Sequence, residues 1–147
     1  MGHDMFIPST IQPDHGYVIL VVVLVAFVNL WAGMKVGAAR RAYNIKYPQM
    51  YAEKSDEYFL EFNCVQRAHQ NMVENLPVFL SLLIASSIYR PMWAALAGLI
   101  RVLGFIVYVI SYSSGDPEKR LFGSFGFLGL FVSVGLCFEA AFRLVTA

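Results

Sequence analysis

The sequence has little charge for its length, and this scarcity limits the kind of protein it can encode. Only 14% of its 147 residues are charged, while 58% are hydrophobic. Soluble domains are typically about 25% charged and about 45–50% apolar. The net charge is +1 and there is no long basic run, so nothing indicates a nucleic-acid partner. We therefore expect a single membrane domain over residues 1–147.

Cysteine and histidine are too few and too scattered to suggest a metal site. The two cysteines, Cys64 and Cys137, form no CxxC pair, and His3, His15 and His69 do not cluster. The cysteines fall at opposite ends of predicted membrane spans, about 20 Å apart in depth at 1.5 Å per residue. We expect neither a bound metal nor a disulfide within the chain.

Lysine and arginine are missing from residues 1–15. A cleaved signal peptide needs a basic start and a shorter apolar core, so the uncharged run from Gly16 to Met34 is better interpreted as a retained membrane anchor. Three further runs of span length follow. The predicted spans are residues 16–38, 62–89, 92–113 and 121–142. Backbone groups inside a bilayer must be satisfied within their own segment, so the predicted fold is an all-α integral membrane four-helix bundle.

Lysine and arginine are distributed unevenly among the connecting segments. They concentrate in the segments after the first and third spans, whereas the other segments carry few. The positive-inside rule then predicts that the first and third loops are cytosolic and that both termini face the other side.

One polar stretch, "FNCVQRAHQNMVENLPVF", leads directly into an apolar run. Arg67, Asn71, Glu74 and Val78 have the i, i+4, i+7, i+11 spacing of one helix face. Residues 62–75 are a solvated loop in one interpretation, and in another an arginine–glutamate pair only holds helices together. A loop would leave too few apolar residues to cross a bilayer. Charge in a membrane costs at least about 2.5–3.5 kcal/mol per residue and usually marks a functional site.

A second helix face carries polar groups in the third predicted span. Arg101, Phe105, Tyr108 and Tyr112 fall on this face. Tyrosines at this depth are also common as membrane-interface residues, so on their own they do not establish a site.

Arginines from separate helix ends reach one cytosolic level. Arg40 and Arg41 end the first span, Arg67 begins the second, and Arg120 follows the third. The planar guanidinium group matches carboxylates in a two-pronged geometry, and Glu74 is able to receive an ammonium group. A ligand with two carboxylates and one amine fits this arrangement, and glutathione is such a molecule.

Three segments together resemble one known family. "FNCVQRAHQNMVE", "ARRAYNIKYPQMY" and "SGDPEKR" occur in the same order as in the membrane-associated proteins of eicosanoid and glutathione metabolism, and most resemble its type 3 microsomal glutathione transferase branch. The resemblance implies a homotrimer in the endoplasmic reticulum membrane, with glutathione as co-substrate and no prosthetic group.

The resemblance also implies roles for particular residues. Glutathione would be bound by Arg40, Arg67, His69, Asn71, Glu74, Tyr108 and Tyr112, with Arg120 stabilising the thiolate and Arg41 acting as an acid. Two positions depart from the family pattern. Relatives often have arginine where Phe105 stands, and the cysteinyl-leukotriene synthase has tyrosine at the position of Asn75. These departures favour general glutathione chemistry over leukotriene synthesis.

The expected activity is therefore that of a glutathione transferase or peroxidase acting on lipophilic electrophiles or lipid hydroperoxides in the membrane. Two other functions stay open. A non-catalytic lipid-binding or scaffold member of the family would be expected to lack the arginine set, which this sequence retains. A small transporter using Glu74 would be expected to carry polar residues on both sides of the bilayer midplane, whereas here they gather towards one edge.

Overall fold

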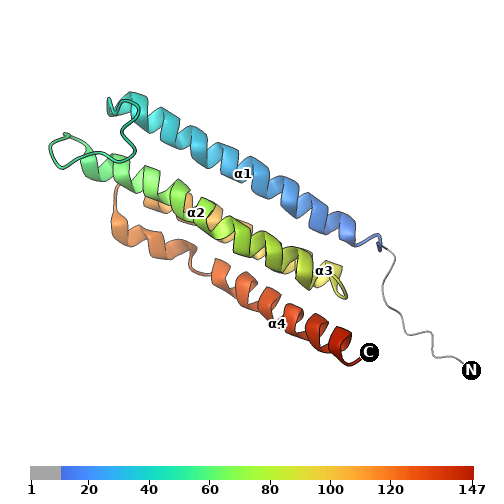
Figure 1. Cartoon of the computed structure of the whole chain (residues 1–147). Coiled ribbons are helices and arrows are strands. Elements are labelled where there is room, and N and C mark those ends of the chain that lie inside the picture. The colour runs from blue at the N-terminus through green and yellow to red at the C-terminus, as the bar shows by residue number, and fades with distance from the viewer. Residues whose placement is uncertain (1–10) are drawn as a thin grey trace, which may run out of the picture.

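The computed structural model describes residues 11–147, in which all regular structure is helical (Figure 1). The four long helices are α1 (His15–Ala42), α2 (Phe59–Ser86), α3 (Pro91–Tyr112) and α4 (Gly126–Val145), and the 3-10 helix η1 (Pro117–Gly123) lies between α3 and α4. The predicted all-α class is confirmed for this part of the chain. His3 and the other residues before position 11, on which part of the orientation prediction rests, lie outside the described residues.

Three of the four long helices are apolar enough to cross a membrane. These are α1, α3 and α4. Helix α2, like α1, has 28 residues. Its first half contains the polar stretch, and α2 is not among the helices that are apolar enough to span a membrane. The span predicted over residues 62–89 therefore stays a prediction.

The helix ends differ from the predicted span ends in informative ways. Residues 62–75 lie within α2, so their interpretation as a solvated loop is wrong. Helix α1 continues to Ala42, which places Arg40 and Arg41 in its last turn. Helix α4 begins only at Gly126, because residues 117–123 form η1. The Asp116 side chain caps η1 by accepting a hydrogen bond of 3.0 Å from the backbone N–H of Glu118.

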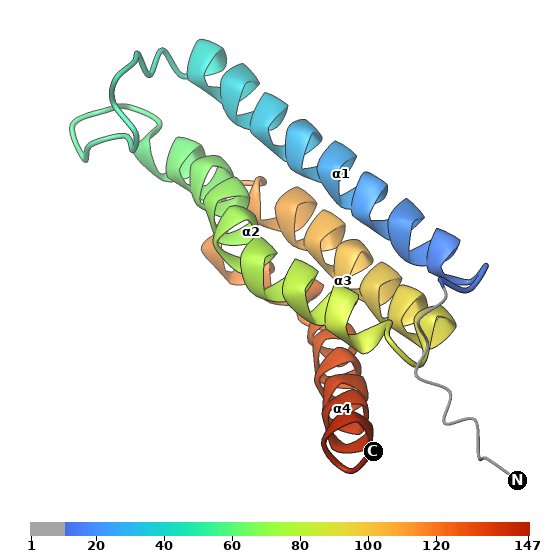
Figure 2. The same ribbon diagram turned by 45° about the vertical axis from the view of Figure 1, so that its right-hand side comes forward.

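Helix α3 is central to the packing. It contacts α1, α2, η1 and α4, while α1 and α4 lie on opposite sides of it (Figure 2). Met72 and Leu83 of α2 and Val102 of α3 are fully buried in the core that these helices share. Large apolar side chains on the outer faces remain exposed, including Phe27 of α1 and Phe131 of α4. Such faces suit contact with lipid or with another subunit.

Glycines bring α4 unusually close to α3. A Cβ atom on Gly129 would lie 2.2 Å from the carbonyl oxygen of Ala97, and one on Gly104 would lie 2.5 Å from the Cα of Gly126. Small residues at such contacts let two membrane helices approach backbone to backbone. This contact fixes η1 and the start of α4 against α3.

The loops divide between the two ends of the molecule. The segments at residues 43–58 and 113–125 lie at one end, and the turn at residues 87–90 and the C-terminus lie at the other (Figure 1). The two loops predicted to be cytosolic thus share an end, although the compartment they face stays a prediction.

Candidate functional site

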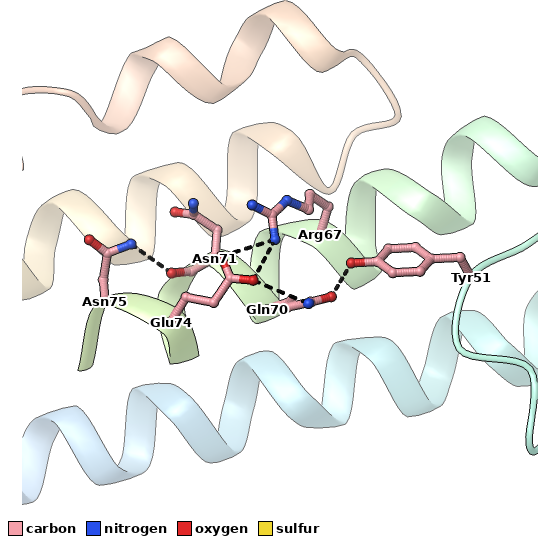
Figure 3. Close-up of polar contacts among 6 residues, drawn as sticks. All are labelled: Tyr51, Arg67, Gln70, Asn71, Glu74 and Asn75. Atoms are coloured by element: carbon pink, nitrogen blue, oxygen red, sulfur yellow. Dashed lines mark hydrogen bonds and ion pairs between the residues drawn. The ribbon is translucent and has the colours of Figure 1, made fainter. Parts of the chain in front are cut away.

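A polar cluster occupies one face of α2. The Arg67 Nη1 donates hydrogen bonds of 2.9 and 3.1 Å to the two carboxylate oxygens of Glu74, and the Gln70 Nε2 donates one of 3.2 Å to the same carboxylate. Tyr51, from the loop before α2, donates its hydroxyl hydrogen to the Gln70 side-chain oxygen (Figure 3). Arg67 and Glu74 belong to the same helix, so this pair does not join two helices, and the interpretation as an interhelical tie is wrong within the chain.

The ion pair is open to its surroundings. The side chains of Arg67 and Glu74 are 39% and 48% exposed. Among residues 11–147, no other helix covers the pair, which is held by hydrogen bonds within α2 alone. The two groups are therefore accessible to a charged ligand.

Two asparagines extend the cluster one turn deeper. The Asn75 Nδ2 donates a hydrogen bond of 2.8 Å to the backbone oxygen of Asn71 (Figure 3), and the Asn75 Oδ1 accepts one of 3.2 Å from the Arg101 Nη2. The amide nitrogen of Asn75 is thus anchored on α2 itself, and its amide oxygen links α2 to α3.

A groove of about 240 Å³ lies beside this cluster, where α2, α3, η1 and α4 meet. Three of its lining residues were predicted as site residues, namely Asn71, Tyr108 and Arg120. Tyr112 joins them indirectly, because its ring packs edge-on against that of Tyr108 with centroids 5.5 Å apart. The groove therefore collects predicted site residues from α2, α3 and η1 within one chain.

Arg120 lies on η1 at the end of the groove nearest the loops. Its Nη1 donates a hydrogen bond of 2.6 Å to the backbone oxygen of Pro117, three residues earlier, and the residue is exposed. No salt bridge involves Arg120 in the described part of the chain. Its positive charge is therefore available to a negatively charged group in the groove.

Arg40 and Arg41 lie elsewhere. Arg40 is only 8% exposed and donates hydrogen bonds of 2.6 and 3.3 Å to the backbone oxygens of Gln49 and Met50. Arg41 lines a separate hollow with Arg40 and residues 44–47. Within one chain, the structure does not bring these two arginines to the groove.

His69 also faces away from the groove. Its Nε2 lies 3.2 Å from the Asn29 Oδ1, and its ring packs against Gly33, so it belongs to the contact between α2 and α1. Among the described residues, no group of His, Cys, Asp and Glu side chains could hold a metal ion, and Cys64 and Cys137 are free thiols.

Three residues of the groove and the polar cluster were not predicted from the sequence. Phe127 lines the groove from α4, and Tyr51 and Gln70 complete the polar chain. Tyr51 and Phe127 lie on other segments, which no helical spacing relates to α2. Gln70 does carry a signal, since it precedes Glu74 by four residues and can hydrogen-bond along the helix.

The fold and the site first define a class of protein. The chain is a helical integral membrane protein with a groove at one end, where arginine, asparagine and tyrosine side chains meet.

Comparison with known proteins identifies the family. The chain belongs to the MAPEG family, whose model matches residues 18–142. It is also 31% identical over 119 residues to human microsomal glutathione S-transferase 2, a match covering 78% of this chain and 76% of the relative. The family predicted from the three segments is thereby confirmed, while the assignment to its type 3 branch stays a prediction.

Proposed function

We propose that this protein is a membrane-bound glutathione transferase that activates the glutathione thiol in the groove. The family and the glutathione S-transferase relative support this activity. The observation that carries it is the meeting of Asn71, Tyr108 and Arg120 in one cavity, beside the Arg67–Glu74 pair. These side chains supply cations, an anion and neutral hydrogen-bonding groups, which together match a peptide with two carboxylates and an ammonium group.

Binding would proceed by exchange of ionic partners. The Glu74 carboxylate turns from Arg67 to the ammonium group of glutathione, and the freed Arg67 receives one of its carboxylates. Both side chains are partly exposed, so the ligand can reach them, and its own ammonium and carboxylate groups replace the interaction that the pair gives up. Asn71 and Tyr108 then orient the peptide by hydrogen bonding, and Tyr112 supports the Tyr108 ring.

Arg120 carries the activation step in this proposal. A free thiol has a pKa of about 8–9, so little thiolate exists at neutral pH, and a neighbouring guanidinium favours the anion. The thiolate attacks an electrophilic carbon to form a thioether. With a lipid hydroperoxide it attacks the peroxide oxygen instead, releasing the alcohol. A second glutathione then converts the resulting sulfenic acid to the disulfide and water.

The proposed assembly is a homotrimer of four-span subunits in the endoplasmic reticulum membrane, with the first and third loops cytosolic. In this arrangement the groove is completed by a neighbouring subunit. Arg40, Arg41 and His69 lie outside the groove of their own chain, so their proposed roles with glutathione depend on that assembly. Leukotriene synthesis is not part of the proposal, because Phe105 and Asn75 depart from the family pattern.

Replacing Arg120 tests the proposal. Arg120→Ala should shift the pH–rate profile of conjugation to higher pH and lower the bound thiolate seen by ultraviolet absorbance, since each unit of thiol pKa corresponds to about 1.36 kcal/mol of preference for the anion. Arg120→Lys should recover part of the loss, because it keeps the charge but not the planar geometry.

Lys119→Ala is the matched control. Lys119 is the preceding residue, carries the same charge and pairs with Asp116 at 3.8 Å, but does not line the groove. Its removal should leave the pH–rate profile in place. An unchanged thiolate fraction in Arg120→Ala, or an equal shift in Lys119→Ala, would contradict the role assigned to Arg120.

A further inference from the structure

A buried arginine lies at the far end of the groove from Arg120. Arg101, in the middle of α3, is only 4% exposed and lines the same groove. Its guanidinium carbon lies 4.4 Å from the ring centroid of Phe105 and 4.6 Å from that of Phe127. The charge is thus held between two aromatic faces, an arrangement that attracts a cation but offers no hydrogen-bond acceptor.

The hydrogen bonding of Arg101 is incomplete. Its Nη2 donates to Asn75 at 3.2 Å, while its buried Nε has no partner. None of the ion pairs within residues 11–147 includes Arg101. A guanidinium presents five N–H donors, and a buried charge without an anion is strongly disfavoured. The deep end of the groove is therefore suited to an anionic acceptor.

Asn75 accepts one hydrogen bond from Arg101 but cannot serve as its missing anion. Its amide nitrogen is committed to the backbone oxygen of Asn71, which turns its oxygen towards Arg101. A neutral amide oxygen orients the guanidinium without neutralising it. Asn75 thus fixes one edge of Arg101 and leaves other donors of the group for a molecule in the groove.

The chemistry of the groove changes along its length. Arg101 lies seven residues before Tyr108, about 10 Å deeper along α3. Arg120, Asn71 and Tyr108 form the polar end, whereas Phe105 and Phe127 flank Arg101 at the deep end. A ligand spanning the groove would need an apolar middle, a reacting atom near Arg120 and an anionic group near Arg101.

We propose that Arg101 binds the carboxylate of the second, lipophilic substrate, so that the protein prefers electrophiles built on a fatty-acid chain over their uncharged counterparts. This inference rests on the proposed glutathione chemistry. In the proposed trimer, the two carboxylates of glutathione are bound by Arg67 and by Arg40 of a neighbouring subunit, its ammonium group by Glu74 and its thiolate by Arg120, which leaves Arg101 for the molecule entering from the membrane. Its reacting carbon or peroxide oxygen would lie about 10 Å from its carboxylate, the distance along α3 between Arg101 and Tyr108.

A matched substrate pair tests this assignment. The purified protein with saturating glutathione is assayed with a long-chain fatty acid bearing a conjugated enone and with its methyl ester, and kcat/KM is compared. The acid should be preferred by about tenfold to hundredfold, the range for a hydrogen bond to a charged group. In Arg101→Gln this preference should fall towards one, and in Arg101→Lys it should be partly kept. Equal kcat/KM values for the acid and the ester in the parent protein would overturn the inference, and this measurement requires no variant.

Controls separate this role from a structural one. Arg143→Gln removes an arginine from the opposite end of the molecule and should leave the acid-to-ester ratio unchanged. If Arg101→Gln lowers activity with acid and ester equally, or weakens glutathione binding to the same extent, Arg101 is not the carboxylate site. Equilibrium binding of a fluorescent fatty acid and its methyl ester provides an assay independent of turnover. Preferential acid binding that requires Arg101, without any conjugation, would uphold this inference and refute the proposed function.

Discussion

Arg120 and Arg101 line the same groove, but different neighbours hold their guanidinium groups. Arg120 is exposed and donates to a single backbone oxygen on its own turn. Arg101 is buried between two aromatic rings and fixed by Asn75. Because only one hydrogen bond holds its side chain, Arg120 can turn towards a charge that develops during the reaction. The fixed guanidinium of Arg101 is better suited to discriminating among ligands.

Glu74 provides a test of ligand binding at the same scale. Glu74→Gln keeps the shape of the side chain but removes the charge that is proposed to receive the ammonium group. A charged hydrogen bond contributes about 1.5–3 kcal/mol, so glutathione affinity measured by calorimetry should fall at least tenfold. The helix itself should persist, because glutamine keeps the length of the side chain and its amide oxygen can still accept a hydrogen bond from Arg67.

Glu139 offers the matched control for that substitution. It accepts hydrogen bonds from Arg90 and Arg143 at the opposite end of the molecule, and its carboxylate raises the pKa of Arg90. Glu139→Gln should therefore leave glutathione affinity unchanged. Undiminished affinity in Glu74→Gln would remove Glu74 from the binding site.

The contact between α3 and α4 sets the shape of the groove at the level of whole elements. A Cβ on Gly129 would meet the Ala97 carbonyl oxygen at 2.2 Å and the Arg101 backbone nitrogen at 2.9 Å. Both are backbone atoms, so the two helices must separate to admit a methyl group. Overpacking of this kind costs about 1–3 kcal/mol. Gly129→Ala should lower the melting temperature in detergent and also weaken substrate binding.

Gly135 lies on the same helix and provides the comparison. A Cβ there would have no neighbour within 4 Å, and alanine is a better helix former than glycine. Gly135→Ala should leave the melting temperature the same or slightly higher. Equal melting temperatures for the two variants would show that the close contact is not needed for stability.

The sequence predicts helices better than it predicts which side chains meet. Helical spacing within α2 and α3 correctly placed Asn71 and Tyr108 on the faces that line one groove. His69 was assigned by resemblance, and nothing in the sequence showed that its ring packs towards α1. The start of α4 was predicted too early, because the apolar residues Leu121 and Phe122 resemble a span although they form part of η1. Periodicity reports the face of a helix, whereas contacts between helices depend on crossing geometry.

At the scale of the whole molecule, the open groove and the exposed apolar faces favour self-association. We predict a homotrimer, because a single subunit leaves the groove unenclosed and leaves Arg40 and Arg41 outside it. Native mass spectrometry in detergent should give three times the chain mass of 16.5 kDa. A monomer that retained full transferase activity would contradict this prediction.

The polar face of α2 has a consequence for how the chain enters the bilayer during synthesis. Helices α1, α3 and α4 are apolar enough to partition into lipid as single segments, but α2 is not. If α2 spans the bilayer as predicted, pairing Arg67 with Glu74 lets it enter with those two charges mutually neutralised, and contact with other helices must meet the remaining cost. Helix α3, the central packing partner, follows α2 in the chain. The proposed insertion of α2 therefore depends on packing against a helix that is synthesised after it.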